Sequence, residues 1–171
     1  MIAAFTPSNI LGLTTAQIPS LNQIQIPAFE SRDLSVLTSK QWPAFTTSQI
    51  QQFTTTQINK LPSASLARLT TTQVAAFTTA QVSALSPTNV AGLTTNHIKV
   101  LSADQIKALE TADIVKLTSK QLGVLNTQQV QALDLFQLNK LTSTQLKAMS
   151  GDQLGALTSA QIPALSTAFI K

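Results

Sequence analysis

Apolar residues recur along this chain with a period of eight. From Phe5 to Leu165 every eighth residue is Leu, Phe or Met, which gives 21 octads without insertion or deletion. Numbered from that residue, the consensus is L-[TS]-[TS]-x-Q-[IVL]-x-A, and residues 69–85 (LTTTQVAAFTTAQVSAL) contain it twice. Position 6 is also apolar in every octad. A motif kept in constant register over the whole chain predicts a single repeat array.

Each octad carries the residue types that begin a helix. Position 2 is Thr, Ser, Asn or Asp in eighteen octads, and these side chains accept hydrogen bonds from the free N–H groups of a first helical turn. Position 5 is Gln in fourteen octads, which is the spacing of a capping box. The apolar residues at positions 1 and 6 have the spacing of a hydrophobic staple. We therefore expect one helix start in each octad.

A continuous helix does not fit the pattern. Eight residues at about 100° each move the apolar face by about 80° per octad, so the apolar stripe would wind around the helix. Pro19, Pro27, Pro43 and Pro163 occupy position 7, where a long helix would lose a hydrogen bond and meet a steric clash. Strands are disfavoured because positions 1, 6 and 8 do not alternate with period two. The pattern predicts an all-α solenoid of one- to two-turn helices, one per octad.

Such short helices must be held by contacts between coils, because helix nucleation costs more than one turn returns. Phe5, Phe29, Phe53 and Phe77 recur at every third octad, although Phe45 departs from this series. The spacing indicates three octads per coil. Packed layers about 8–10 Å apart would then give a rod roughly 55–70 Å long.

The array is expected to span residues 1–171 as one domain, with 20 full octads from residue 5 and partial octads at both ends. Neither end shows the polar terminal cap that keeps solenoids separate. We therefore expect a slice of a longer array or copies that stack end to end. Four apolar residues near the ends are candidate interface residues: Ile2, Phe5, Phe169 and Ile170.

Composition narrows the possible functions. The chain has 11 Lys and Arg against 7 Asp and Glu, and the basic residues are scattered instead of lying along one face, so no nucleic-acid partner is expected. There is no Cys, which excludes disulfides and thiolate metal sites. No apolar run approaches the length of a membrane-spanning helix, so no membrane insertion is expected. The opening segment, MIAAFTPSNI, lacks the basic start of a signal peptide.

No catalytic, cofactor-binding or metal site is expected, because no Gly-rich phosphate loop, HExxH or EF-hand spacing occurs. We interpret the chain as a non-enzyme that needs no cofactor. His97, Asp33 and Asp113 stand at position 5 in place of Gln, and we interpret all three as helix-capping residues.

Two departures from the consensus are candidates for a partner contact. Trp42, the single Trp, replaces the usual aliphatic residue at position 6 and is either a core side chain or an interface anchor. Leu135 and Phe136 stand at two usually exposed positions. They either form a contact surface or are covered by a neighbouring coil.

The runs LTTTQVAAFTTAQVSAL and LTSTQLKAM (residues 69–85 and 141–149) resemble the tandem LTTxQ[IV]xAL-type repeats of large bacterial secreted, surface or adhesin-like proteins. The resemblance implies an extracellular or cell-surface structural role and carries no catalytic residues. The leading expectation is a rod that stacks head to tail with itself into a filament, or a segment of a longer surface stalk. The alternatives are an adhesion module that uses Trp42, Leu135 and Phe136 to bind other surface proteins and, more remotely, ice or surface binding by a Thr array.

Overall fold

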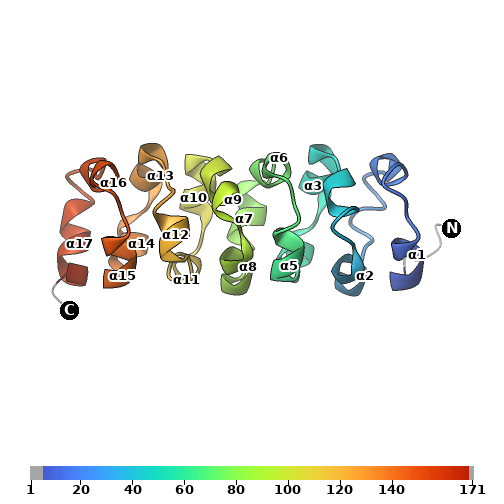
Figure 1. Ribbon diagram of the computed structural model, residues 1–171, viewed down its shortest axis with the longest axis horizontal. Coiled ribbons are helices and arrows are strands. Elements are labelled where there is room, and N and C mark those ends of the chain that lie inside the picture. Colours follow the sequence, from blue (N-terminus) through green and yellow to red (C-terminus); the bar gives the residue numbers. More distant parts are fainter. Residues whose placement is uncertain (1–5, 170–171) are drawn as a thin grey trace.

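The computed structural model describes residues 6–169, with side chains described as far as residue 165. Figure 1 shows a rod in which short helical coils follow one another along the long axis, from the N-terminal end to the C-terminal end. The described residues contain seventeen α-helices, two 3-10 helices and no strand. The prediction of an all-α solenoid of very short helices is confirmed.

The α-helices contain four to eight residues each. They are α1 (Pro7–Leu11), α2 (Ser31–Val36), α3 (Thr47–Gln52), α4 (Thr55–Asn59), α5 (Ser63–Leu66), α6 (Thr71–Ala75), α7 (Thr79–Ser83), α8 (Pro87–Gly92), α9 (Thr95–Val100), α10 (Ala103–Ala108), α11 (Thr111–Ile114), α12 (Ser119–Leu122), α13 (Thr127–Ala132), α14 (Leu135–Asn139), α15 (Ser143–Lys147), α16 (Gly151–Gly155) and α17 (Ile162–Phe169). The 3-10 helices are η1 (Ile18–Ser20) and η2 (Trp42–Ala44).

Helices three octads apart pack side by side. Helix α10 packs against α7 and α13, α8 packs against α5 and α11, and α14 packs against α11 and α17. Near the N-terminus α1 packs against α2. These two helices are also three octads apart, because the two octads between them contain no α-helix. The members of each pair stand three octads apart in register, so the expected coil of three octads is confirmed.

The core follows octad positions 1 and 6. From residue 10 to residue 146 every position-6 side chain is at most 1% exposed, and from residue 29 to residue 141 every position-1 side chain is at most 4% exposed. Burying one such aliphatic side chain contributes about 1.5–3 kcal/mol. Coil stacking therefore supplies the stability that a single octad lacks.

Three octads within the described part of the chain form no α-helix, and each has Pro at position 7. Octads 13–20 and 37–44 contain η1 and η2, and octad 21–28 contains turns only. Pro has no N–H to donate to the carbonyl four residues earlier. At the end of these octads the backbone forms hydrogen bonds between residues i and i−3 instead, such as the bond from Ser20 N–H to Gln17 O at 3.0 Å. Pro163 is tolerated because it is the second residue of α17, where no helical N–H bond is required.

Candidate functional site

The predicted capping box forms repeatedly along the rod. In octad 69–76 Thr70 Oγ1 accepts the Gln73 N–H at 3.1 Å, and Gln73 Oε1 accepts the Thr70 N–H at 2.8 Å. The same reciprocal pair forms with Ser102 and Gln105 and with Asn126 and Gln129. The roles predicted for positions 2 and 5 are confirmed.

The amide nitrogen of the same Gln makes a second contact that sequence reasoning missed. Gln129 Nε2 donates to Ile98 O at 2.8 Å and to Leu101 O at 2.7 Å, 31 and 28 residues earlier in the chain. All twelve position-5 Gln residues from Gln41 to Gln161 donate to the carbonyl 28 residues earlier, at 2.6–2.9 Å. We call this contact the coil clamp.

The coil clamp explains why a buried position carries an amide. The twelve clamp Gln residues are 1–5% exposed, and a buried polar group is costly unless it is hydrogen-bonded. Gln offers an acceptor oxygen for its own helix and two N–H donors for the neighbouring coil. Glu and Leu lack these donors.

Two other residue types form the same clamp. Asn89 Oδ1 accepts the Ser86 N–H at 2.9 Å, and its Nδ2 donates to Leu61 O, 28 residues earlier. His97 Nδ1 accepts the Thr94 N–H at 3.3 Å, and its Nε2 lies 2.9 Å from Leu69 O, also 28 residues earlier. The predicted capping role of His97 is confirmed. Burial lowers the pKa of His97, whereas the bond to Leu69 O raises it.

One octad replaces the clamp with a different side chain. Ser65 at position 5 is 1% exposed, and no hydrogen bond joins it to Leu37 O, the carbonyl that corresponds to the clamp acceptor of the other octads. Arg68 Nη1 donates to Leu37 O at 2.8 Å instead. This octad also has Pro62 in place of the capping hydroxyl. It therefore departs from the consensus at positions 2, 5 and 8 together.

Asp113 and Asp33 form only the capping half of the arrangement. Asp113 Oδ2 accepts the Glu110 N–H at 3.0 Å, and Asp33 Oδ2 accepts the Glu30 N–H at 2.9 Å. The Oδ1 atom of each is buried without a hydrogen-bond partner in the described structure. Burial raises the pKa of Asp113 to about 6, the Glu110 N–H bond opposes this rise, and the Glu110 charge adds to it.

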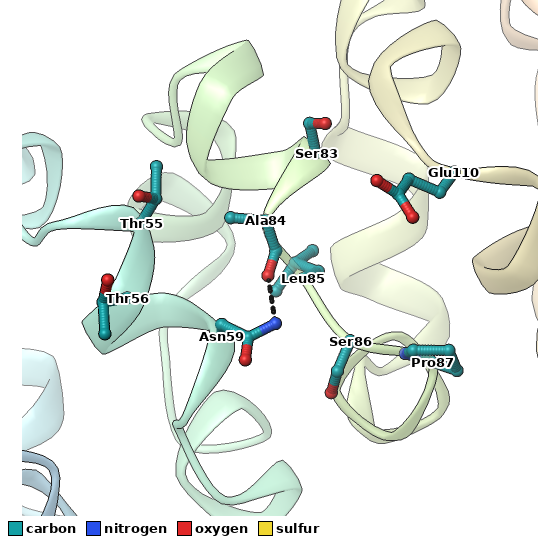
Figure 2. Close-up of a pocket in the computed structure, with 9 residues that line it drawn as sticks. All are labelled: Thr55, Thr56, Asn59, Ser83, Ala84, Leu85, Ser86, Pro87 and Glu110. Atoms are coloured by element: carbon teal, nitrogen blue, oxygen red, sulfur yellow. Dashed lines mark hydrogen bonds between the residues drawn. The ribbon is translucent and has the colours of Figure 1, made fainter.

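Two open grooves lie between coils on the surface. The first, of about 410 Å³, is bordered by Thr55, Thr56 and Asn59 on one side and by residues 83–87 and Glu110 on the other (Figure 2). Asn59 Nδ2 donates to Ala84 O at 2.9 Å across its edge. Glu110 is the single ionisable side chain in this lining, so the groove offers no pair of groups for acid–base catalysis.

The second groove is more highly charged. Its lining includes Glu30, Arg32 and Lys60. Arg32 Nε and Glu30 Oε2 lie 2.9 Å apart, and the two side chains are 63% and 62% exposed. Exposed pairs of this kind contribute little to stability, and the groove contains no buried charged group that would mark a ligand site.

The candidate interface residues lie in different environments. Trp42 is completely buried and packs against Phe45 and Phe53, with ring centroids 5.6 and 6.1 Å away, as the core interpretation predicts. Phe136 is 79% exposed and Leu135 is 48% exposed, so the expectation that a neighbouring coil covers them is wrong. Their role as a contact surface stays a prediction. Ile2, Phe5 and Ile170 lie outside the described residues, as does the side chain of Phe169.

A family model for the ALTTAQ repeat matches this chain four times, at residues 26–63, 59–95, 106–143 and 136–167. Together these matches cover most of the sequence. The chain belongs to the ALTTAQ repeat family. Each ALTTAQ match spans several consecutive octads, which agrees with the tandem repeats predicted from sequence. Searches of curated proteins and of solved structures return no significant match.

Among the described residues, no group of three or more His, Cys, Asp or Glu side chains is arranged to hold a metal ion. None of the helices within the described part of the chain is long and apolar enough to cross a bilayer.

Proposed function

We propose that this chain is a non-enzymatic structural rod of ALTTAQ repeats that extends by the addition of coils at its ends. In one version, copies of the chain stack end to end into an extracellular filament. In the other, the chain is a segment of a longer surface stalk. The carrying observation is an exposed side chain at a core position near the C-terminal end of the described rod. Ile162, at position 6, is 57% exposed, whereas its counterparts from residue 10 to residue 146 are at most 1% exposed.

The first described coil is open in a complementary way. Gln17 at position 5 is exposed, and Leu13 and Leu21 at position 1 are only partly buried. At the other end of the rod, Gln161 is the last position-5 Gln, and it clamps Leu133 O. Carbonyls beyond it, such as that of Leu157, stand where a following coil would place clamp donors. Another ALTTAQ coil would therefore bury apolar side chains and add hydrogen bonds of the kind already found inside the rod.

Negative-stain microscopy over a wide concentration series tests self-assembly. The chain is expected to form filaments whose length grows with concentration. Ile162→Asp, which places a charge on the end face, should leave short particles, whereas Phe136→Ser on the side of the rod should not affect filament formation. Short monodisperse particles of the unmodified chain at every concentration would rule out self-assembly and leave the stalk segment.

A second candidate, a protein-interaction module, is favoured by the exposure of Phe136 and Leu135 at the start of α14. Exposed aromatic side chains are typical anchors of protein interfaces. Replacing both residues with Ser should abolish binding to a partner surface protein while leaving the circular dichroism spectrum unchanged. Ile24→Ser, at another exposed apolar residue (67% exposed), is the matched control. Binding that survives the double replacement would remove this candidate.

A further inference from the structure

Asp113 occupies a clamp position inside the rod without a clamp donor. The position-5 Gln residues from Gln41 to Gln161, together with Asn89 and His97, all place a side-chain nitrogen next to the carbonyl 28 residues earlier. For Asp113 the corresponding carbonyl is that of Leu85. Asp113 is 1% exposed, and its Oδ1 has no hydrogen-bond partner in the described structure.

Asn89 shows that a side chain as short as that of Asp reaches this carbonyl. Asn89 Oδ1 accepts the N–H of its capping residue, and Nδ2 donates to Leu61 O. Asp113 has the same number of side-chain atoms, and its Oδ2 accepts the N–H of its capping residue, Glu110, at 3.0 Å. By this correspondence, Asp113 Oδ1 takes the place of Asn89 Nδ2, which would put it next to the Leu85 carbonyl.

Two oxygens that face each other in this way need a hydrogen between them. An ionised carboxylate only accepts hydrogen bonds, whereas a protonated carboxyl also donates one. An unpaired buried oxygen costs the desolvation free energy of the group, and the cost is larger when the group is charged. The protonated form of Asp113 would satisfy both oxygens, and the ionised form would leave two acceptors opposed.

Few charged side chains lie on the elements packed around Asp113. Helix α11 packs against α8 and α14. Helices α7 and α8 carry no ionisable side chain, Asp134 and Lys140 flank α14, and Glu110 and Lys116 flank α11 itself. No ion pair joins Asp113 to any described cation. Burial is the main cause that raises the pKa of Asp113, the Glu110 N–H bond lowers it, and the Glu110 charge raises it further.

We propose that Asp113 is a proton-dependent coil clamp. In its protonated form Oδ1–H donates to the Leu85 carbonyl and joins α11 to the preceding coil. In its ionised form the two oxygens repel each other, and this coil boundary is weaker. The joint at Asp113 therefore tightens in mildly acidic solution and loosens near neutral pH.

The direction of the pH effect follows from the two pKa values. The folded chain binds the Asp113 proton more tightly than the unfolded chain, because the pKa is raised from 3.8 to about 6. The stabilisation is complete below pH 3.8 and is lost as the pH rises to about 6 and above. From these two values, the opening equilibrium of this joint should increase on the order of tenfold between pH 5 and pH 7.5.

Amide hydrogen exchange over residues 85–92 and 110–117 measures that equilibrium. Asp113→Asn is the matched variant, because Asn89 shows that Asn forms the clamp at position 5, and both chains carry His97→Gln to remove the other titrating clamp. The parent should open about tenfold more at pH 7.5 than at pH 5, and Asp113→Asn should show no such change. Glu110→Gln should lower the pKa of Asp113.

Three results would overturn the proposal. One is the same pH dependence of exchange in the parent and in Asp113→Asn. Another is a carboxyl carbon resonance of Asp113 that titrates at the ordinary pKa of an aspartate. The third is protection of the parent by Na⁺ or Ca²⁺ above neutral pH that is absent in Asp113→Asn, which would show that a cation occupies the site instead of a proton.

Discussion

The position-5 Gln joins two levels of structure through one side chain. Its oxygen closes the capping box of its own helix, and its nitrogen binds the carbonyls of a neighbouring coil, as Gln129 does with Asn126 on one side and Leu101 on the other. Because both ends of the amide are buried and paired, loss of the side chain orphans several polar groups at once.

Gln129→Ala should lower the free energy of unfolding by at least about 3 kcal/mol, since each orphaned buried polar group costs about 1–3 kcal/mol. Gln128→Ala, at the exposed neighbouring residue of α13, should change it by less than about 0.5 kcal/mol. Urea denaturation followed by circular dichroism measures both. Similar small effects from the two variants would contradict the role of the clamp.

His97 gives the rod a second pH dependence, opposite in sign to that of Asp113. Nδ1 accepts the Thr94 N–H, so a neutral ring with its proton on Nε2 fits both contacts. Because burial lowers the pKa of His97 below 6.5, its contribution to stability is present above pH 6.5 and is lost as the pH falls through the folded-state pKa.

Thermal unfolding at a series of pH values tests this sign. The melting temperature of the unmodified chain should fall, relative to that of His97→Gln, as the pH is lowered from 7 to 5. The Asp113 contribution cancels in this comparison because both chains retain that residue. A gap that stays constant across this range would show that His97 does not titrate between the folded and unfolded states.

The sequence predicted half of each clamp residue's role. The bond from Gln73 to Thr70 depends only on a spacing of three residues, so the capping box was readable from the octad. The bond from Gln73 to Phe45 O spans 28 residues and depends on how many octads complete a coil. Arg68, which bonds to Leu37 O beside Ser65, gave no local signal for the same reason.

At the scale of helices, a departure from the consensus in one octad is accompanied by a second departure in the octad that packs against it, one coil later. Helix α5 follows Pro62 instead of a capping hydroxyl and packs closely against α8, which ends at Gly92. A Cβ at Gly92 would lie 2.8 Å from Ser63 Cα and 2.9 Å from Ser63 O. Glycine is therefore required at position 8 of this octad, where Ala is usual.

Gly92→Ala should destabilise the chain by about 1–3 kcal/mol, because the added methyl group overlaps the backbone of α5. Gly155→Ala is the matched control, since a Cβ there meets nothing within 4 Å, and it should be neutral or slightly stabilising because Ala favours helix more than Gly does. Denaturation midpoints of the two variants provide the measurement. Equal midpoints would show that α5 moves away without cost.

At the scale of the whole molecule, the octad period predicted a solenoid and the recurrence of Phe at every third octad predicted its coil. The packing of α7 on α10 and of α10 on α13 confirms that coil. The octad alone did not decide whether Leu135 and Phe136 are exposed or covered, because this depends on how the adjacent coils pack. Their exposure came only with the structure.

Pairwise distances along one face of the rod test the account most directly. The chain has no Cys, so spin labels can be placed at exposed position-4 residues, pairing Ser48→Cys with Asn96→Cys, Lys120→Cys or Thr144→Cys. Stacked three-octad coils predict equal steps of about 8–10 Å per coil, which gives roughly 30–40 Å for the longest pair. Distances that do not rise in equal steps, or a longest pair near the roughly 144 Å of a continuous helix, would contradict the three-octad coil.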